Sequence, residues 1–285
     1  MNTQILDGKK LGLEIRKELA QKLNLLRQDQ NRSKEIPGLA AILVGNDPAS
    51  QVYIKQKENA LKEIGFHSEI YRLPGEILQA DLLSLIQTLN HARHIDGILV
   101  QLPLPPHLKP EIILHAVNPS KDVDGFHIEN LGKLFSGNPR FIPCTPKGIL
   151  RLLQNALIDI KGKKAVVVGR SLIVGKPMAL LLLQEDATVA ICHSRTQHLE
   201  KECSTADLLI VAIGKPLFVK STFVKKNAVV VDVGIHRTPN GLVGDVDYKE
   251  VSKIASYITP VPGGVGPMTI AMLLENTWES FLKRD

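Results

Sequence analysis

The sequence predicts an α/β protein made of two α/β domains, with a final helix that packs back on the first domain. Its 285 residues, 44% hydrophobic and 22% charged, are sufficient for two buried cores. Short apolar runs typical of buried parallel strands alternate with helical patterns in two separate series. The second series opens on the stretch VVVGRSLIVGKP, which predicts a strand, a glycine turn and a helix.

The first series predicts the order strand, helix, strand, helix, strand. Asp47 and Pro48 suit the N-cap and the first turn of its first helix, and Gly65 suits the position just past the end of that helix. The expected elements cover residues 39–44, 48–64, 66–73, 78–91 and 95–102. This alternation is typical of an α/β domain.

A connecting helix leads to the second series. Thr145 and Pro146 suit its N-cap and first turn, and we expect it to run to about residue 156. The segment TPVPGGVGPMT interrupts the second series, and a last helix is expected from Thr269 to Lys283. We therefore divide the chain into a first domain of residues 1–146 with 268–285 and a second domain of residues 147–267. The expected strands of the second domain are residues 165–168, 188–192, 208–212 and 229–233.

Composition excludes several classes of protein. The longest apolar stretches fall short of the roughly 18 residues that a membrane-spanning helix needs, and the N-terminus lacks a secretory signal, so we expect a cytoplasmic protein without a membrane partner. The 3 cysteines match no disulfide or zinc spacing, so we expect packing residues and no metal. The net charge of +6 is dispersed and only 4% of residues are aromatic, which favours anionic small molecules over nucleic acid.

The glycine turn that opens the second series indicates a dinucleotide site of Rossmann type. Gly169 allows a tight turn, Gly175 allows close backbone approach, and the following helix directs its N-terminus at phosphate. Ser171 occupies the place of the usual second glycine, so the approach to the pyrophosphate is either altered or supplemented by its hydroxyl. A turn without a ligand is the alternative. An esterase nucleophile turn is disfavoured because the pattern G-x-S-x-G is not met.

The end of the next strand bears on the choice of cofactor. Sites selective for NAD place an acid about 20 residues beyond the glycines, whereas a 2′-phosphate needs cations and donors. Here the strand ends in His193, Ser194, Arg195 and Thr196, with no acid. Together with Arg170 this set favours NADP, although Arg195 could equally be an exposed loop charge.

The first domain holds a candidate catalytic lysine. Lys57 lies four residues after Tyr53 and falls within the apolar stripe of its helix. Desolvation there would lower the pKa of the lysine toward the range of a general acid or base. A lysine that snorkels to solvent is the alternative.

Two loops support the interpretation of Lys57 as a catalytic residue. Gln101 ends a buried strand, where α/β sheets collect their ligands. Asp122 and Asp124 precede a glycine in the stretch KDVDGF. Asp124 is expected either to accept hydrogen bonds from a substrate ring or to form an Asx turn.

Seven stretches together resemble the bifunctional methylenetetrahydrofolate dehydrogenase/cyclohydrolase family. The resemblance extends from about residue 3 to the last helix. Its motifs follow one another in the order and at nearly the spacing of the family. They are LVGNDPASQVYIKQKENALKEIG, DGILVQLPLP, NPSKDVDGF, FIPCTPKGIL, VVVGRSLIVGKPMA, CHSRT and PVPGGVGPMT.

The resemblance implies roles for individual residues. Lys57 matches the catalytic lysine, Gln101 its partner, Tyr53 the residue that stacks on folate, and Asp124 the residue that holds the pterin ring. Arg170 and Ser194 match residues that receive the 2′-phosphate of NADP. The expected NADP-binding residues are Gly169, Arg170, Ser171, Gly175, Ser194, Arg195 and Ile235, and the loop expected to close over the nicotinamide and folate contains Pro262, Gly263, Gly264 and Pro267.

The resemblance also implies the reactions. Methylenetetrahydrofolate is oxidised to the methenyl form with NADP, and water then converts the methenyl form to 10-formyltetrahydrofolate, a reaction of one-carbon metabolism and purine biosynthesis. The expected substrates are tetrahydrofolate derivatives with polyglutamate tails, and the basic chain suits these anionic tails. A homodimer formed through the nucleotide-binding domains is expected. The alternatives are a dehydrogenase of shikimate or amino acid type and a nucleotide-binding regulator without catalysis.

Overall fold

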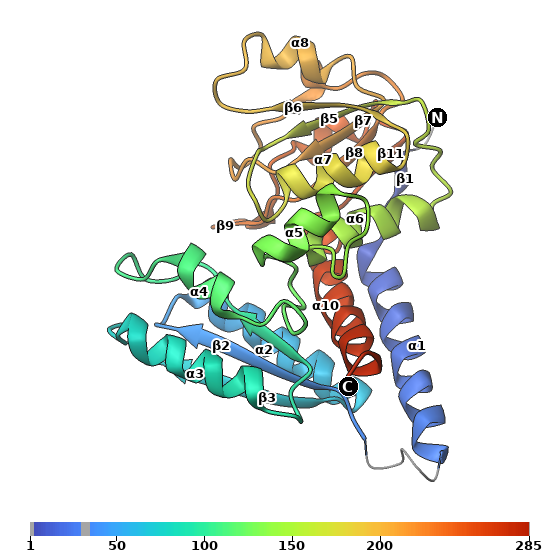
Figure 1. Cartoon of the computed structure of the whole chain (residues 1–285). Coiled ribbons are helices and arrows are strands. Elements are labelled where there is room, and N and C mark those ends of the chain that lie inside the picture. Colours follow the sequence, from blue (N-terminus) through green and yellow to red (C-terminus); the bar gives the residue numbers. More distant parts are fainter. Residues whose placement is uncertain (1–2, 30–34, 285) are drawn as a thin grey trace. The chain divides into compact units, whose positions relative to one another are not determined.

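The computed structural model describes residues 3–29 and 35–284, and the chain divides into two compact units. Unit 1 contains Met1–Gly12 and Thr145–Thr269, and unit 2 contains Leu13–Cys144 and Ile270–Asp285. The colours of Figure 1 allow each unit to be followed along the chain. The division differs from the expected one in the first twelve residues. The reason is that β1 (Gln4–Ile5) pairs in parallel with β11 (Tyr257–Ile258), a strand of unit 1.

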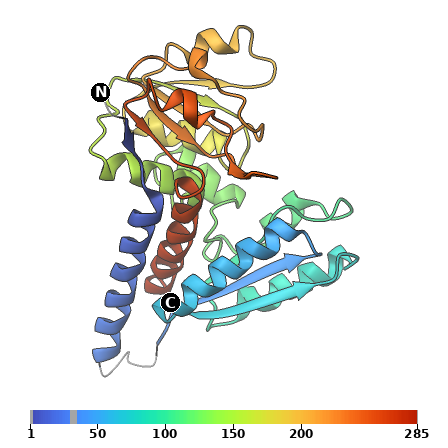
Figure 2. The ribbon, with the colours of Figure 1, turned by 180° about the vertical axis from the view of Figure 1, so that it is seen from behind.

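Unit 2 is built on a parallel sheet with the order β3-β2-β4. Its strands are β2 (Gly38–Val44), β3 (His67–Leu73) and β4 (Gly97–Val100). Helices α2 (Pro48–Ile64) and α3 (Gln79–His91) cover opposite faces, as Figures 1 and 2 show together. The central strand β2 is buried along its whole length, which explains its continuous apolar sequence.

Residues at the two ends of α2 correctly predict where this helix begins and ends. The Asp47 carboxylate accepts a hydrogen bond from the Ser50 N–H at 2.8 Å, which caps the start of the helix. Gly65 ends the helix at φ +80, a conformation that favours glycine. The predicted strands and helices of unit 2 are confirmed, except that β4 is shorter than expected at both ends.

The last helix, α10 (Val265–Leu282), begins four residues earlier than predicted because Pro267 is accommodated in its first turn. Its second half belongs to unit 2, as expected. Asn276 donates to the Val123 carbonyl at 2.8 Å, and Ser280 donates to the Asp96 carbonyl at 2.7 Å. Three further helices were not predicted from the sequence patterns: α1 (Gly8–Gln28), α4 (Pro110–Ala116) and α5 (Ile128–Phe135).

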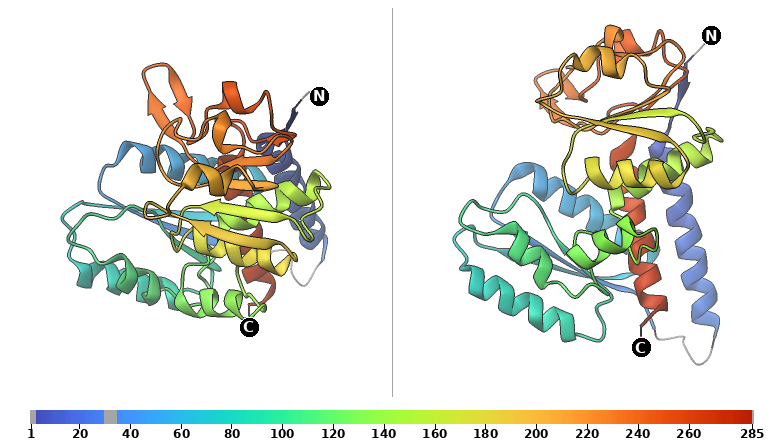
Figure 3. Two further views of the ribbon diagram at one scale, coloured as in Figure 1. Left: turned by 90° about the horizontal axis from the view of Figure 1, so that it is seen from above. Right: turned by 45° about the horizontal axis from the view of Figure 1, so that its top comes forward.

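Unit 1 is built on a parallel sheet with the order β1-β11-β8-β7-β5-β6. Helix α6 (Cys144–Asn155) begins one residue before the expected cap, and the Thr145 hydroxyl instead lies 3.0 Å from the Thr269 hydroxyl. A short hairpin of β9 and β10 extends from the unit (Figure 3). The remaining elements are β5 (Lys164–Val168), α7 (Gly175–Gln184), β6 (Thr188–Cys192), α8 (Leu199–Cys203), β7 (Leu208–Val211), a 3-10 turn (Ser221–Phe223), β8 (Val229–Asp232), β9 (His236–Thr238), β10 (Gly241–Val243) and α9 (Tyr248–Val251).

The core of unit 1 contains Cys192 and Cys203 among valines, leucines and isoleucines of the sheet, as the sequence predicts for packing residues. Among residues 3–29 and 35–284, no helix has the length and apolar character required to span a membrane.

Candidate active site

Lys57 is buried on α2 and contacts Gln101. Only 5% of the lysine is exposed, and its Nζ donates a hydrogen bond to Gln101 Oε1 at 2.9 Å. Gln101 follows β4, and its Nε2 donates to the Leu102 carbonyl at 2.7 Å. This second bond fixes the amide so that its oxygen faces the lysine. The structure therefore brings two of the predicted residues together, and the snorkelling alternative for Lys57 is wrong.

The pKa of Lys57 is lowered from its usual value. Burial is the main cause, because it disfavours the ammonium form, while the negative charge of Asp124 acts in the opposite direction. Burial in turn raises the pKa of Asp124, which Lys57 counteracts. An amine that loses its proton more readily than an exposed lysine can act as a base at a lower pH than that lysine.

The two acids of KDVDGF have different surroundings. The Asp122 carboxylate accepts hydrogen bonds from the Phe126 N–H at 3.2 Å, the His127 N–H at 2.7 Å and Asn130 Nδ2 at 2.8 Å. Burial nevertheless raises the pKa of Asp122 to about 6. Asp122 is thus the residue that organises the turn. Asp124 interacts with Lys57, which favours the ligand-binding alternative for Asp124 over the Asx turn.

Cys144 belongs to this site, although the sequence analysis treats it as a packing residue. Its buried thiol donates to the Val123 carbonyl at 3.3 Å and lies beside the Asp124 carboxyl group. Asn276 Nδ2 lies 3.7 Å from the same sulfur. No spacing motif marks Cys144, so only the folded chain connects it with Asp124.

Tyr53 lies one helical turn before Lys57. Its ring centroid is 5.5 Å from Lys57 Nζ, within the range of a cation–π contact. Burial and the charge of Asp124 both raise the pKa of the phenol, so the ring stays neutral. The site therefore presents a flat aromatic surface beside a buried amine.

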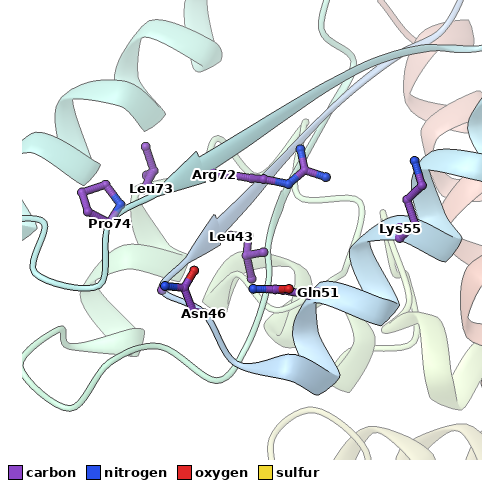
Figure 4. Close-up of a pocket in the computed structure, with 8 residues that line it drawn as sticks. Leu43, Asn46, Gln51, Lys55, Arg72, Leu73 and Pro74 are labelled. Atoms are coloured by element: carbon purple, nitrogen blue, oxygen red, sulfur yellow. The ribbon is translucent and has the colours of Figure 1, made fainter.

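A separate pocket of about 460 Å³ lies beside α2, between this helix and the ends of β2 and β3 (Figure 4). Gln51 and Lys55 line it from α2, and Arg72 lines it from β3. Lys55 and Lys57 are two residues apart, which places them on opposite sides of the helix. Lys55 and Arg72 both pair with Glu58, at 3.3 and 3.7 Å. The pocket therefore has a cationic wall.

In unit 1, the turn between β5 and α7 requires glycine at two places. A Cβ at Gly169 would lie 2.3 Å from the Ala212 carbonyl oxygen, and Gly169 has φ +132. A Cβ at Gly175 would lie 2.2 Å from the Gly169 oxygen. The Ser171 hydroxyl accepts weak hydrogen bonds from Val174 N–H at 3.2 Å and Gly175 N–H at 3.3 Å. Ser171 thus stabilises the first turn of α7.

The expected phosphate-binding side chains lie at one edge of the sheet. Strands β5 and β6 pair directly up to Val168 and Cys192, so the residues that follow both strands lie at their carboxyl ends. Arg170, Ser194 and Arg195 are exposed there. Two guanidinium groups and a hydroxyl at this edge fit a dianionic 2′-phosphate. Ile235, which follows β8, is also exposed.

The glycine segment after β11 is tightly held within unit 1. Lys9 N–H donates to the Gly263 carbonyl at 2.8 Å, and Gly263 has φ +107. A Cβ at Gly264 would lie 2.6 Å from the Pro260 oxygen. Pro262 is exposed, whereas Pro267 lies in α10 and not in the loop that the sequence analysis predicts.

Two buried aspartates that the sequence analysis did not single out shape the loops of unit 1. The Asp245 carboxylate accepts hydrogen bonds from three successive N–H groups, of Ile213, Gly214 and Lys215, at 2.8 to 3.0 Å. Asp232 accepts from three further backbone N–H groups, and burial raises its pKa to about 6. Apart from Gly234, these partners lie 13 or more residues away in the sequence, so no local pattern reveals the two aspartates.

Two family models match the chain. Residues 6–124 match the model described as tetrahydrofolate dehydrogenase/cyclohydrolase, catalytic domain. Residues 143–285 match the model described as tetrahydrofolate dehydrogenase/cyclohydrolase, NAD(P)-binding domain. The two models together cover most of the chain.

Several known proteins are similar to this chain over nearly its full length. A bifunctional protein FolD of Acetivibrio thermocellus is 54% identical over 278 residues, which covers 97% of this chain and 96% of that protein. One from Streptococcus pyogenes is 53% identical over 282 residues, covering 99% of this chain and 98% of that protein.

Solved structures are also similar to this chain over nearly its full length. The bifunctional FolD enzyme of Campylobacter jejuni has a TM-score of 0.95 at 51% identity, covering 99% of this chain and 100% of that one. The Trypanosoma brucei enzyme, solved with NADP cofactor and inhibitor, has a TM-score of 0.95 at 37% identity, covering 99% and 98%. A shikimate dehydrogenase of Aquifex aeolicus, at 14% identity, has a TM-score of 0.50 over 88% of this chain and 92% of that one, a likeness of fold alone.

Proposed function

The chain belongs to the tetrahydrofolate dehydrogenase/cyclohydrolase family, and on this premise we propose how its residues carry out the two reactions of the family. The protein is a bifunctional enzyme that oxidises 5,10-methylenetetrahydrofolate with NADP and hydrolyses the methenyl product to 10-formyltetrahydrofolate. The shikimate-type and regulator alternatives have no comparable support, because the shikimate dehydrogenase likeness concerns only the fold.

The observation that carries the proposal is the buried hydrogen bond between Lys57 Nζ and Gln101 Oε1, at 2.9 Å. Neutral Lys57 removes a proton from water as the water oxygen bonds to the methenyl carbon. The resulting ammonium returns that proton to the folate nitrogen N5 as the bond between the carbon and N5 breaks. The carbinol hydroxyl loses its own proton to solvent and becomes the formyl carbonyl, so one proton is released overall. Gln101 holds the amine in place throughout.

In the oxidation step, the protein mainly positions its substrates. NADP⁺, when bound, supplies the acceptor for the hydride that leaves the methylene carbon. The turn from Gly169 to Gly175 receives the pyrophosphate, and Arg170 and Ser194 receive the 2′-phosphate. In unit 2, Tyr53 stacks on the folate and Asp124 accepts hydrogen bonds from its pterin ring. The roles of the two units, NADP binding for unit 1 and folate binding for unit 2, are part of the proposal.

Gln101→Met tests the proposed partnership. The substitution removes the acceptor of Lys57 and leaves an apolar side chain of similar length. A hydrogen bond from the ammonium that forms on Lys57 during the reaction contributes roughly 1.5–3 kcal/mol, so we expect hydrolysis to slow by about tenfold to a hundredfold. Loss of methenyl absorbance measures the rate. Gln56→Met, on the exposed side of α2, serves as the control and should retain the wild-type rate. Equal rates for the two variants would contradict the proposal.

We also propose that the cationic pocket beside α2 receives the carboxylates of a polyglutamate tail. This proposal is supported by two cations, Lys55 and Arg72, which line the pocket in the same unit as Lys57.

Lys55→Gln tests this binding mode. One exposed ion pair is worth about 0.2–1 kcal/mol, so we expect the KM for a polyglutamylated substrate to rise up to about fivefold. The KM for the monoglutamate should not change. Lys62→Gln is a matched control, because Lys55 and Lys62 both pair with Glu58 and are 60% and 61% exposed, but Lys62 does not line the pocket. An equal effect of both substitutions would argue against the pocket.

We further propose that the enzyme is a cytoplasmic homodimer, joined through unit 1, that supplies formyl groups for purine biosynthesis. The support for self-association is β6, which ends the described sheet of unit 1 and leaves Ile191 42% exposed. An edge strand with exposed apolar residues is a ready surface for pairing with a second chain.

A further inference from the structure

Unit 2 contains a cluster of two histidines and a glutamate apart from the Lys57 site. His67 Nε2 lies 3.0 Å from Glu69 Oε1, and His94 Nε2 lies 2.8 Å from the same oxygen. The centroids of the two imidazole rings are 5.7 Å apart, and the rings meet edge to face. All three ligand atoms lie within 4.8 Å of one another. Three potential metal ligands therefore converge on one point.

The fold brings these residues together at the amino ends of the strands. His67 opens β3 and pairs with Gly38, the first residue of β2. His94 lies in the loop before β4, and its carbonyl oxygen would be only 2.0 Å from a Cβ at Gly38. The absence of a side chain at Gly38 thus allows the His94 loop to lie against β2. Gln101, by contrast, follows the carboxyl end of β4, so the cluster and the Lys57 site occupy opposite ends of these strands.

Tyr71 orients the carboxylate of this cluster. Its hydroxyl donates to Glu69 Oε2 at 2.5 Å, which leaves Oε1 for the two imidazoles. Metal ligands commonly have such outer partners, which fix the direction of the coordinating atom. The cluster therefore has a carboxylate whose orientation is fixed, beside two imidazoles.

We propose that His67, Glu69 and His94 form a binding site for a divalent transition-metal ion of the Zn²⁺ class, with water at the remaining position. Two imidazoles and one carboxylate form a ligand set that Zn²⁺ prefers. Ligands about 2.0–2.2 Å from a tetrahedral ion are roughly 3.4 Å apart, so the two histidine–carboxylate separations, 3.0 and 2.8 Å, need to widen only slightly to admit an ion. The His94 side chain is 61% exposed, so the ion can enter from solvent.

The ion would act on stability and not on catalysis. It would join β3 to the loop that contains His94. Glu69 and His94 are 25 residues apart in the sequence. An ion that binds the folded chain alone stabilises it by mass action. Because the cluster lies at the far end of the strands from Gln101, we expect neither hydrolysis nor oxidation to depend on the ion. The inference does not rest on the roles proposed for the active site.

Zinc titration of the chelator-treated full chain tests the site, with ZnCl₂ alone as the probe. We expect one equivalent to bind by calorimetry and to raise the Tm. His94→Ala and Glu69→Gln should each remove this binding, while Tyr71→Phe should weaken it by about ten- to a hundredfold. His91→Ala is the control, because His91 is an exposed histidine of the same unit whose Nδ1 lies 2.7 Å from the Gln87 carbonyl oxygen of its own helix.

The variants also separate this site from other zinc contacts. Glu69→Gln keeps the size of the side chain, so its fold can be compared with wild type by circular dichroism before zinc is added. Retention of full zinc affinity by both His94→Ala and Glu69→Gln would overturn the proposal, as would failure of the wild-type chain to bind zinc more tightly than these variants.

Discussion

Lys57→Met is expected to abolish hydrolysis of methenyltetrahydrofolate while folate binding persists. General acid–base catalysis by a positioned side chain contributes about 10²–10⁴-fold, and the substitution removes the only group to which we assign proton transfer. Methionine has a similar length and suits a position that is only 5% exposed, so the fold should remain intact. Loss of methenyl absorbance measures hydrolysis, and quenching of protein fluorescence measures folate binding.

The oxidation reaction supplies an internal comparison for Lys57→Met. The folate nitrogens stabilise the methenyl cation themselves, so NADPH formation should fall much less than hydrolysis. Lys62→Met, on the exposed side of α2, should leave both rates unchanged. Hydrolysis by Lys57→Met within about fivefold of wild type would exclude Lys57 as the proton-transfer group.

The pH dependence of hydrolysis provides a second measurement on the same two proteins. Burial lowers the pKa of Lys57 from its usual 10.5. The neutral amine therefore becomes available as pH rises through a value below 10.5, and kcat/KM should rise over that range. This rising limb should be missing from the residual activity of Lys57→Met. A limb that survives the substitution would have to come from another group.

Gly175→Ala is expected to disrupt NADP binding. The added Cβ would lie 2.2 Å from the Gly169 oxygen and 2.8 Å from the Arg170 N, and both are backbone atoms that cannot move aside independently. Overpacking of this kind costs about 1–3 kcal/mol, so we expect lower stability to urea. Because the displaced turn also carries Arg170, the Kd for NADPH should rise by about tenfold or more, measured by nucleotide fluorescence.

Gly132→Ala is the matched control for Gly175→Ala. A Cβ at Gly132, within α5, meets no atom within 4 Å, so this variant should bind NADPH normally and gain up to about 1 kcal/mol of stability. Hydrolysis by Gly175→Ala should persist, because its proposed residues belong to unit 2. Normal NADPH affinity in Gly175→Ala would show that the nucleotide does not use this turn.

Much of the fold follows from local sequence. Asp47, Pro48 and Gly65 mark the ends of α2 because capping depends on residues within one turn of the helix terminus. The continuous apolar runs of β2 and β5 predict buried parallel strands for the same local reason. The apolar stripe of α2 also places Lys57 on the inner side of the helix, and the structure decides for burial over snorkelling.

Other features depend on partners far along the chain. Strand β1 has only two residues, too few for any periodicity, and exists because β11 pairs with it. The contact between Lys57 and Gln101 joins residues separated by 44 positions. The nearby Cys144 thiol carries no local signature of its place beside Asp124.

The sequence by itself determined the two α/β series, the glycine turn and the types of residue available for catalysis, because each of these is encoded within a few neighbouring positions. Only the tertiary structure decided that Asp122 holds a turn while Asp124 faces Lys57, and that His67, Glu69 and His94 converge. The physical reason is that burial, hydrogen bonding and pKa depend on atoms close in space, and the packing of strands and helices brings those atoms together from distant parts of the chain.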